Sequence, residues 1–212
     1  MEKNTHVDKL LTLSLFHNVL ARSFSPKREE VAKSLMLLEE ITRRVPCEDV
    51  RKLLLEMLQN IEKDPEATSD YFKLFELGAS PPYETSYTSS SKKEALVLEK
   101  ADVAGFYRAF GVKHAGEYPD HVAVQLEFLS LLLLKEAAAL GEGDEENAET
   151  CRQARMKFLE KHLGGWVRLF SQHVEKNAEK PAYVLWCRIL VESLKLATVC
   201  LRGAVNKPEQ EW

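Results

Sequence analysis

Four polar side chains that could do chemistry lie close together at the start of the most apolar stretch of the chain. Glu117, Asp120 and His121 precede this stretch, and Glu127 lies within it. Carboxylates and imidazoles are ligands in many metal sites and also serve in general acid–base catalysis. Asp120 and His121 are consecutive, however, so on a helix their side chains point about 100° apart and converge poorly on one ion. A metal or acid–base site is therefore the less favoured interpretation.

The rest of the sequence carries no signature of an enzyme. It has no Gly-rich phosphate loop, no dinucleotide-binding fingerprint and no H-E-x-x-H motif. The four cysteines, Cys47, Cys151, Cys187 and Cys200, are scattered and form no C-x-x-C pair, which is typical of small apolar residues in a reducing compartment. We therefore predict a protein that is not an enzyme and that holds no cofactor and no metal.

Residues 119–140 are predicted to form a central buried helix. Pro119 suits the first turn of a helix, and Asp120 places negative charge at the positive end of the helix dipole. The residues that follow are apolar almost all the way round the helix, so it needs neighbours on most sides. Within such a helix a structural Glu127 must be paired or hydrogen-bonded. Alternatively, Glu127 lines a recognition site with Asp120 and His121, two residues that could instead simply cap the helix.

Apolar residues at helical spacing predict further helices on both sides of this central one. The sequence shows no β alternation and no internal repeat, so the predicted fold is all-α, a single globular helical domain over residues 1–212. The other expected helices cover residues 5–23, 26–45, a segment containing 50–61, 64–78, 102–110, a segment from 144 to a break at 162–165, 166–174 and 181–201.

One long irregular segment, residues 79–92, interrupts the predicted helices. Loops of this length inside compact domains are usually functional or mobile. Tyr83 and Tyr87 stand out in this Ser/Thr/Pro-rich segment, because an aromatic side chain there must pack on the core or bind something. A second, acidic turn is expected at 141–146, where Asp144 can cap the following helix.

The composition excludes several classes of function. With 212 residues, 45% of them hydrophobic, the chain can form a sizeable core. A net charge of -4, without a basic run interleaved with aromatic residues, argues against nucleic-acid binding and leaves a basic peptide as a possible partner. No stretch reaches the roughly 18 apolar residues of a membrane span, and the N-terminus shows no signal peptide. The expected location is the cytoplasm.

An ordered set of motifs resembles the TorD/DmsD/NarJ-type assembly chaperones. The Glu-Tyr-Pro-Asp-His run at 117–121, followed by Gln-Leu-Glu-Phe-Leu at 125–129, is similar to the acidic-Pro-Asp-His signature of that family. Further similar pieces occur in the order expected for the family, namely residues 71–75, 82–84 with Tyr87, 102–111 and 158–170.

The resemblance implies an all-helical cytoplasmic chaperone for a molybdenum-cofactor oxidoreductase. Such chaperones bind the N-terminal twin-arginine signal peptide of the catalytic subunit, or a remnant of it, and hold back export until the cofactor is inserted. The implied partners are this peptide and the catalytic subunit of a molybdenum-containing reductase or dehydrogenase. Two departures from the family pattern, Tyr118 between the Glu and the Pro and Gln125 where many members carry Glu, leave the client enzyme open.

A twin-arginine signal combines two cations with an apolar helix-forming run, so its site needs carboxylates and an apolar groove. Exposed ion pairs contribute only about 0.2–1 kcal/mol each, so the apolar run should supply most of the affinity. The expected peptide-binding residues are Tyr83, Glu84, Tyr87, Phe106, Tyr107, Glu117, Pro119, Asp120, His121 and Glu127.

The alternative function is a non-enzymatic helical scaffold or regulator that binds a folded partner through the same surface. The expected oligomeric state is a monomer or a domain-swapped dimer, with residues 112–118 or 141–144 as the hinge.

Overall fold

The computed structural model describes residues 2–25, 28–45, 47–64, 66, 68–78, 80–88, 93–113, 116 and 118–199. Within these residues the only strand pairing is an isolated antiparallel bridge between Tyr83 and His121. The predicted all-α fold is confirmed. The elements are α1 (Glu2–Ser23), α2 (Arg28–Thr42), α3 (Glu48–Lys63), the π-helical turn η1 (Phe72–Glu76), α4 (Thr85–Thr88), α5 (Lys93–Ala109), α6 (Val122–Glu142), α7 (Glu145–Phe158), the π-helical turn η2 (Leu159–Leu163), α8 (Gly164–Asn177) and α9 (Pro181–Val199).

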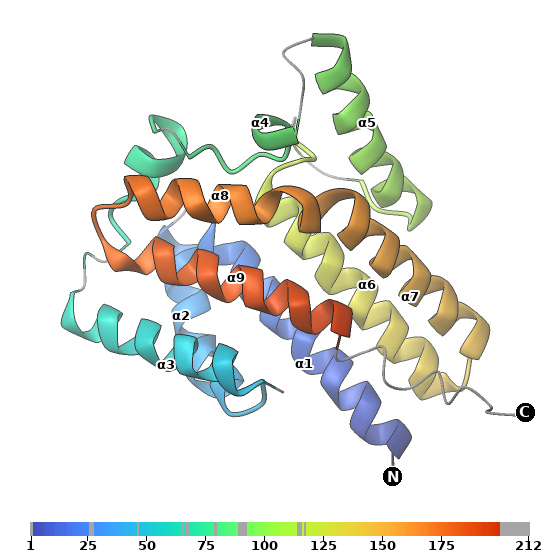
Figure 1. Cartoon of the computed structure of the whole chain (residues 1–212). Helices are drawn as coiled ribbons and strands as arrows, with labels where there is room; N and C mark the ends of the chain where they lie inside the picture. Colours follow the sequence, from blue (N-terminus) through green and yellow to red (C-terminus); the bar gives the residue numbers. More distant parts are fainter. Residues whose placement is uncertain are drawn as a thin grey trace, which may run out of the picture.

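The apolar helix α6 lies at the centre, with α1 along one side and α7 along another (Figure 1). Ser14 and Ser130 fasten α1 to α6, because the hydroxyl of each donates to the backbone carbonyl of the other, at 2.9 and 2.8 Å. The helix starts later than the predicted residue 119. His121 has an extended backbone and accepts a hydrogen bond from the Ala123 amide at 3.1 Å, so it is the N-cap. The capping interpretation is therefore confirmed for His121.

The predicted helix 64–78 is wrong in extent, and only η1 is regular within it. Asp64 accepts a hydrogen bond from the Glu66 amide at 2.9 Å, which turns the chain instead of starting a helix. Asp70 then accepts from the amides of Glu179 and Lys180, at 3.1 and 2.8 Å, and so fastens this turn to the connection between α8 and α9. The helix predicted at 102–110 begins earlier than expected, at Lys93.

The predicted break at residues 162–165 is also wrong, because η2 joins α7 to α8 in one bent helical path (Figure 1). The wider π turn brings the backbone close to itself at Gly164. A Cβ atom at this position would lie 2.6 Å from the Leu159 carbonyl oxygen, closer than real contacts allow. The glycine therefore permits the π turn and does not end the helix, and π turns of this kind are frequent at functional sites.

A buried ion pair ties together α6, α7 and α9. Arg155 of α7 donates to both carboxylate oxygens of Glu136 of α6, at 2.9 and 3.3 Å, and both side chains are almost inaccessible to solvent. The same guanidinium donates to the backbone carbonyl of Ala197 in α9.

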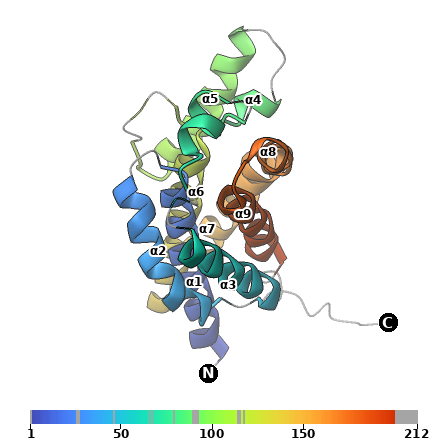
Figure 2. The same ribbon diagram turned by 90° about the vertical axis from the view of Figure 1, so that its left-hand side faces the viewer.

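The outer end of α5 projects from the body of the molecule, as Figures 1 and 2 show from two directions. Val97 and Leu98 at this end are exposed, whereas Val103 and Tyr107 nearer the C-terminal end are buried. Among the described helices, none is both long enough and apolar enough to cross a membrane.

Candidate functional site

The start of α6 is covered by a segment that we call the strap, residues 80–88, which ends in the single turn α4. Two backbone hydrogen bonds join the strap to the chain before α6, from the Glu84 amide to the Asp120 carbonyl at 3.0 Å and from the Val122 amide to the Pro82 carbonyl at 2.9 Å. The described part of the long loop predicted at 79–92 is therefore held against the start of α6. Residues 79 and 89–92 lie outside the described part of the chain.

Asp120 is fully buried and holds the start of α4. Its carboxylate accepts from the Thr85 hydroxyl at 2.6 Å and from the Thr85 amide at 3.3 Å, and Lys100 of α5 lies 3.7 Å away. The preceding residue, Pro119, is joined to α5, because the Tyr107 hydroxyl donates to the Pro119 backbone carbonyl at 2.6 Å. Asp120 therefore positions the strap, and the bond between Tyr107 and Pro119 positions α5.

Glu84 is also buried, within a polar network beneath the strap. It accepts from the Gln125 side-chain amide, and it lies 3.0 Å from His162 Nδ1 in η2. Gln125 in turn accepts from the Trp166 indole at 3.2 Å, and the far nitrogen of His162 lies 3.6 Å from Asp102. The amide of Gln125 thus serves as a donor to Glu84 and an acceptor from Trp166 at once, which a carboxylate could not do.

An aromatic surface, the tyrosine face, consists of Tyr83, Tyr118 and His121. The Tyr83 ring lies 5.1 Å from each of the other two rings, and Lys100 lies 4.8 Å from the Tyr118 ring. Tyr118 is 50% exposed. Burial lowers the pKa of His121 to about 4, so this imidazole is neutral near pH 7.

An exposed carboxylate, Glu76, acts electrostatically on Tyr83 of the tyrosine face. Burial raises the pKa of Tyr83, and the negative charge of Glu76 raises it further. Glu76 carried no signal in the sequence, where it looks like an ordinary charge on the surface of a helix.

A pocket of about 400 Å³, the Tyr118 pocket, opens between the C-terminal end of α5 and α6. Glu127 lies in its lining and is exposed, so the prediction of a buried, satisfied Glu127 is wrong. Neighbouring groups shield it from solvent enough to raise its pKa, an effect that the positive charge of Arg22 partly offsets. The lining residues are Tyr107, Val112, Lys113, Gly116, Tyr118, Val124, Glu127, Phe128 and Leu131.

Two other predicted residues lie apart from the tyrosine face. Tyr87 packs inward, with its ring stacked on Trp166 at 5.6 Å. Phe106 is half-buried and meets the rings of Phe158 and His162 edge-on, at 5.4 and 5.2 Å. The remaining predicted residue, Glu117, lies outside the described residues.

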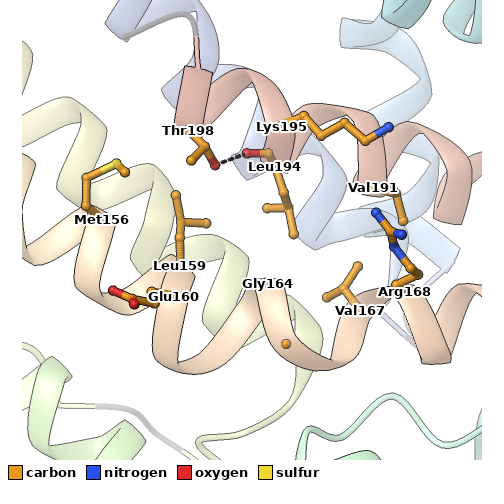
Figure 3. A pocket seen from close by; sticks show the side chains of 11 residues that line it. Met156, Leu159, Glu160, Gly164, Val167, Arg168, Val191, Leu194, Lys195 and Thr198 are labelled. Atoms are coloured by element: carbon orange, nitrogen blue, oxygen red, sulfur yellow. Dashed lines mark hydrogen bonds between the residues drawn. The ribbon is translucent and has the colours of Figure 1, made fainter. Parts of the chain in front are cut away.

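A larger groove of about 540 Å³ is lined by residues of the α7–α8 path and of α9, and it contains none of the predicted residues (Figure 3). Its apolar floor is bordered by charges of both signs, from Glu160, Arg168 and Lys195. The Thr198 hydroxyl in its wall donates to the Leu194 carbonyl at 2.7 Å (Figure 3). In the part of the chain that the structure describes, no group of three or more His, Cys, Asp or Glu residues could hold a metal ion.

Comparison with known proteins identifies the family. Residues 45–172, more than half of the chain, match the family described as the nitrate reductase delta subunit. The chain belongs to this family. The resemblance to TorD/DmsD/NarJ-type chaperones is thereby confirmed. No solved structure matches the chain.

Curated relatives agree with this assignment. A chlorate reductase assembly chaperone of Ideonella dechloratans is 34% identical over 113 residues, which cover 50% of this chain and 56% of the relative. A selenate reductase assembly chaperone of Thauera selenatis is 31% identical over 111 residues, with the same coverage. The chaperone protein TorD of Photobacterium profundum is 26% identical over 166 residues, 74% of each chain. The chain thus spans about half the length of the first two relatives. Their names as chaperones support the prediction that the chain is not an enzyme.

Replacing Asp120 by Ala is expected to lower the free energy of unfolding by about 1–3 kcal/mol, because Thr85 loses a buried acceptor. Urea denaturation measures this change. Asp120→Asn is the matched control, since its amide oxygen can still accept from Thr85. Unchanged stability of Asp120→Ala together with weakened peptide binding would contradict the positioning role and return Asp120 to direct recognition.

Proposed function

We propose that this protein is a cytoplasmic assembly chaperone for a molybdenum-cofactor oxidoreductase. It binds the N-terminal twin-arginine signal peptide of the catalytic subunit, or a remnant of it, and holds it until the cofactor is inserted. The names of the relatives, assembly chaperones of chlorate, selenate and perchlorate reductases, support a client of this class. The observation that carries the proposal is an aromatic and apolar surface with an exposed carboxylate, Glu127, next to the family signature.

Recognition of the two arginines is assigned to Glu76 and Glu127. Each is exposed, whereas Glu84 and Asp120 are buried and already bonded to other side chains. A guanidinium group binds a carboxylate through two parallel hydrogen bonds and also stacks on aromatic faces such as that of Tyr118. Glu84 and Asp120 contribute indirectly, by holding the strap against α6.

The first apolar residues that follow the arginines are assigned to the Tyr118 pocket. Val124, Phe128 and Leu131 of α6 line it, with Tyr107 and Val112 on the opposite side. Since exposed ion pairs contribute little free energy, burial of apolar side chains here supplies most of the affinity.

Glu127→Gln is expected to weaken binding of the matching signal peptide about two- to fivefold, as calorimetry would measure, because one exposed charge pair is lost. The same substitution should have no effect on a peptide whose arginines are replaced by glutamine, so a double-mutant cycle isolates the pair. The matched control is Glu160→Gln, which removes an exposed carboxylate from the other groove. Equal losses for both peptides would contradict the assignment of Glu127 to an arginine.

A peptide panel tests the function as a whole. Signal peptides of molybdenum reductases should bind at micromolar concentration or tighter, and versions with shuffled arginines should bind more weakly. The scaffold or regulator alternative requires no such preference. Absence of binding to every peptide would overturn the chaperone proposal in favour of recognition of a folded partner.

A further inference from the structure

The strap inserts one large side chain, Tyr87, between α4 and α8. Its ring stacks on Trp166 with an interplanar angle of 21° and meets Phe170 and His173 edge-on, at 6.0 and 5.3 Å. Trp166 and Phe170 are completely buried, although α8 lies near the surface of the fold. The Tyr87 ring therefore covers part of the aromatic surface that Trp166 and Phe170 form.

The packing of Tyr87 leaves its hydroxyl group without a hydrogen-bond partner among the described residues. Its hydroxyl oxygen is buried, and no described residue forms a hydrogen bond with it. A buried hydroxyl without a partner retains the penalty of leaving water. The closed position of the strap is therefore less stable than its aromatic contacts alone indicate.

Polar contacts also hold the strap closed. Glu84 bonds with His162 and Gln125, and Asp120 accepts from Thr85. α4 is a single turn, which is too short to be stable without these contacts. A short segment of this kind can open locally at a lower free energy than the whole protein needs to unfold.

The Tyr118 pocket alone cannot bury the apolar run of a signal peptide, so a second apolar surface is required. Its volume of about 400 Å³ lies near the lower end of ligand pockets and is too small for the whole apolar run of a signal peptide. Tyr83 of the tyrosine face and Tyr87 lie on the same strap, separated by Glu84 and the start of α4. A peptide bound at the tyrosine face therefore contacts the strap that carries Tyr87.

We propose that Tyr87 is a displaceable plug, and that the apolar run of the client peptide replaces its ring against Trp166 and Phe170 when the strap opens. The identity of the occupant rests on the proposed function. The existence of the covered surface rests only on the contacts of the strap.

Whether Tyr87→Ala binds the signal peptide more tightly or more weakly than the natural protein tests the proposal. Tyr87→Ala is expected to bind the signal peptide about tenfold more tightly than the natural protein, because no ring has to be displaced first. Tyr87→Phe keeps the plug and removes only the unpartnered hydroxyl, so it should bind equally or more weakly. Calorimetry on both variants makes the comparison. Weaker binding by a folded Tyr87→Ala would overturn the proposal, because it would make Tyr87 a direct peptide contact.

A second measurement does not depend on the client. Folded Tyr87→Ala should enhance the fluorescence of the apolar dye anilinonaphthalene sulfonate, whereas Tyr87→Phe should not; equal dye signals would overturn the covered surface. If Tyr87→Ala enhances the dye fluorescence but no variant binds a signal peptide, the covered surface is supported. The peptide as its occupant, and the proposed function, are then overturned.

Hydrogen exchange tests the opening in the unaltered protein, even if Tyr87→Ala does not fold. The amides of Glu84 and Val122, which bond across the strap, should exchange faster than the Leu129 amide within α6. Exchange of all three amides only through global unfolding would overturn the proposal.

Discussion

Replacing Arg155 by Met is expected to lower the free energy of unfolding by about 3–5 kcal/mol. The guanidinium is the donor to both oxygens of Glu136, whose side chain is 2% exposed, so the substitution leaves a buried carboxylate without compensation. The Ala197 carbonyl loses a donor at the same time. Urea denaturation monitored by circular dichroism measures the change.

The double variant Arg155→Met, Glu136→Leu is the control. Two apolar side chains of similar volume remove both buried charges together, so most of the lost stability should return. Two partly exposed surface pairs, Arg152 with Glu149 and Lys195 with Glu192, provide the comparison, and breaking either should change stability by less than about 1 kcal/mol. A single Arg155→Met variant as stable as these would show that the charges of the buried pair are solvated in solution.

The helical pattern of the sequence predicts most of the fold because helix periodicity is a local property. Leu10, Leu13 and Phe16 recur at helical spacing, and all three are buried in α1. Asp144 caps α7 as predicted, accepting from the Asn147 amide at 3.0 Å. The pairing of Arg155 with Glu136 has no such local signal, since the two residues come from different helices and each looks like a surface charge.

Errors in the predicted elements arise where a side chain or a glycine changes the local geometry. Gly164 and Gly165 resemble a helix break, yet Gly164 allows the π turn that carries His162 to Glu84. Asp64 resembles a helix start, but its carboxylate turns the chain at Glu66. Sequence spacing alone does not distinguish these outcomes, because each depends on which backbone group the residue meets.

For the candidate site, the motif locates the region but not the role of each residue. Glu84 and Asp120 were expected to face a peptide. Their partners, His162, Gln125 and Thr85, lie far away in the sequence, so their burial could not be foreseen. The proposed recognition carboxylates are therefore identified by exposure, a property that only the folded chain shows.

Acid is expected to destabilise the protein between pH 6.5 and 4 through His17. This side chain is fully buried, with Nδ1 2.7 Å from the Leu13 carbonyl. Burial, aided by the positive charge of Arg155 and opposed by the Leu13 hydrogen bond, lowers its pKa from 6.5 to about 4. The unfolded chain therefore binds a proton at a higher pH than the folded one. The stability due to neutral His17 is complete above pH 6.5 and is lost as the pH falls to 4, by about 3 kcal/mol.

Urea denaturation of the natural protein and of His17→Gln at pH 7 and pH 4.5 measures this contribution. Glutamine cannot gain a proton in this range, and its amide can donate to Leu13 in place of the imidazole. The variant should therefore lose less stability than the natural protein when the pH is lowered. His121, whose pKa is also lowered to about 4, remains in both proteins and acts in the same pH window, so part of the acid sensitivity should persist. Identical pH dependence in the two proteins would show that the pKa of His17 is not lowered by folding, and would contradict the prediction.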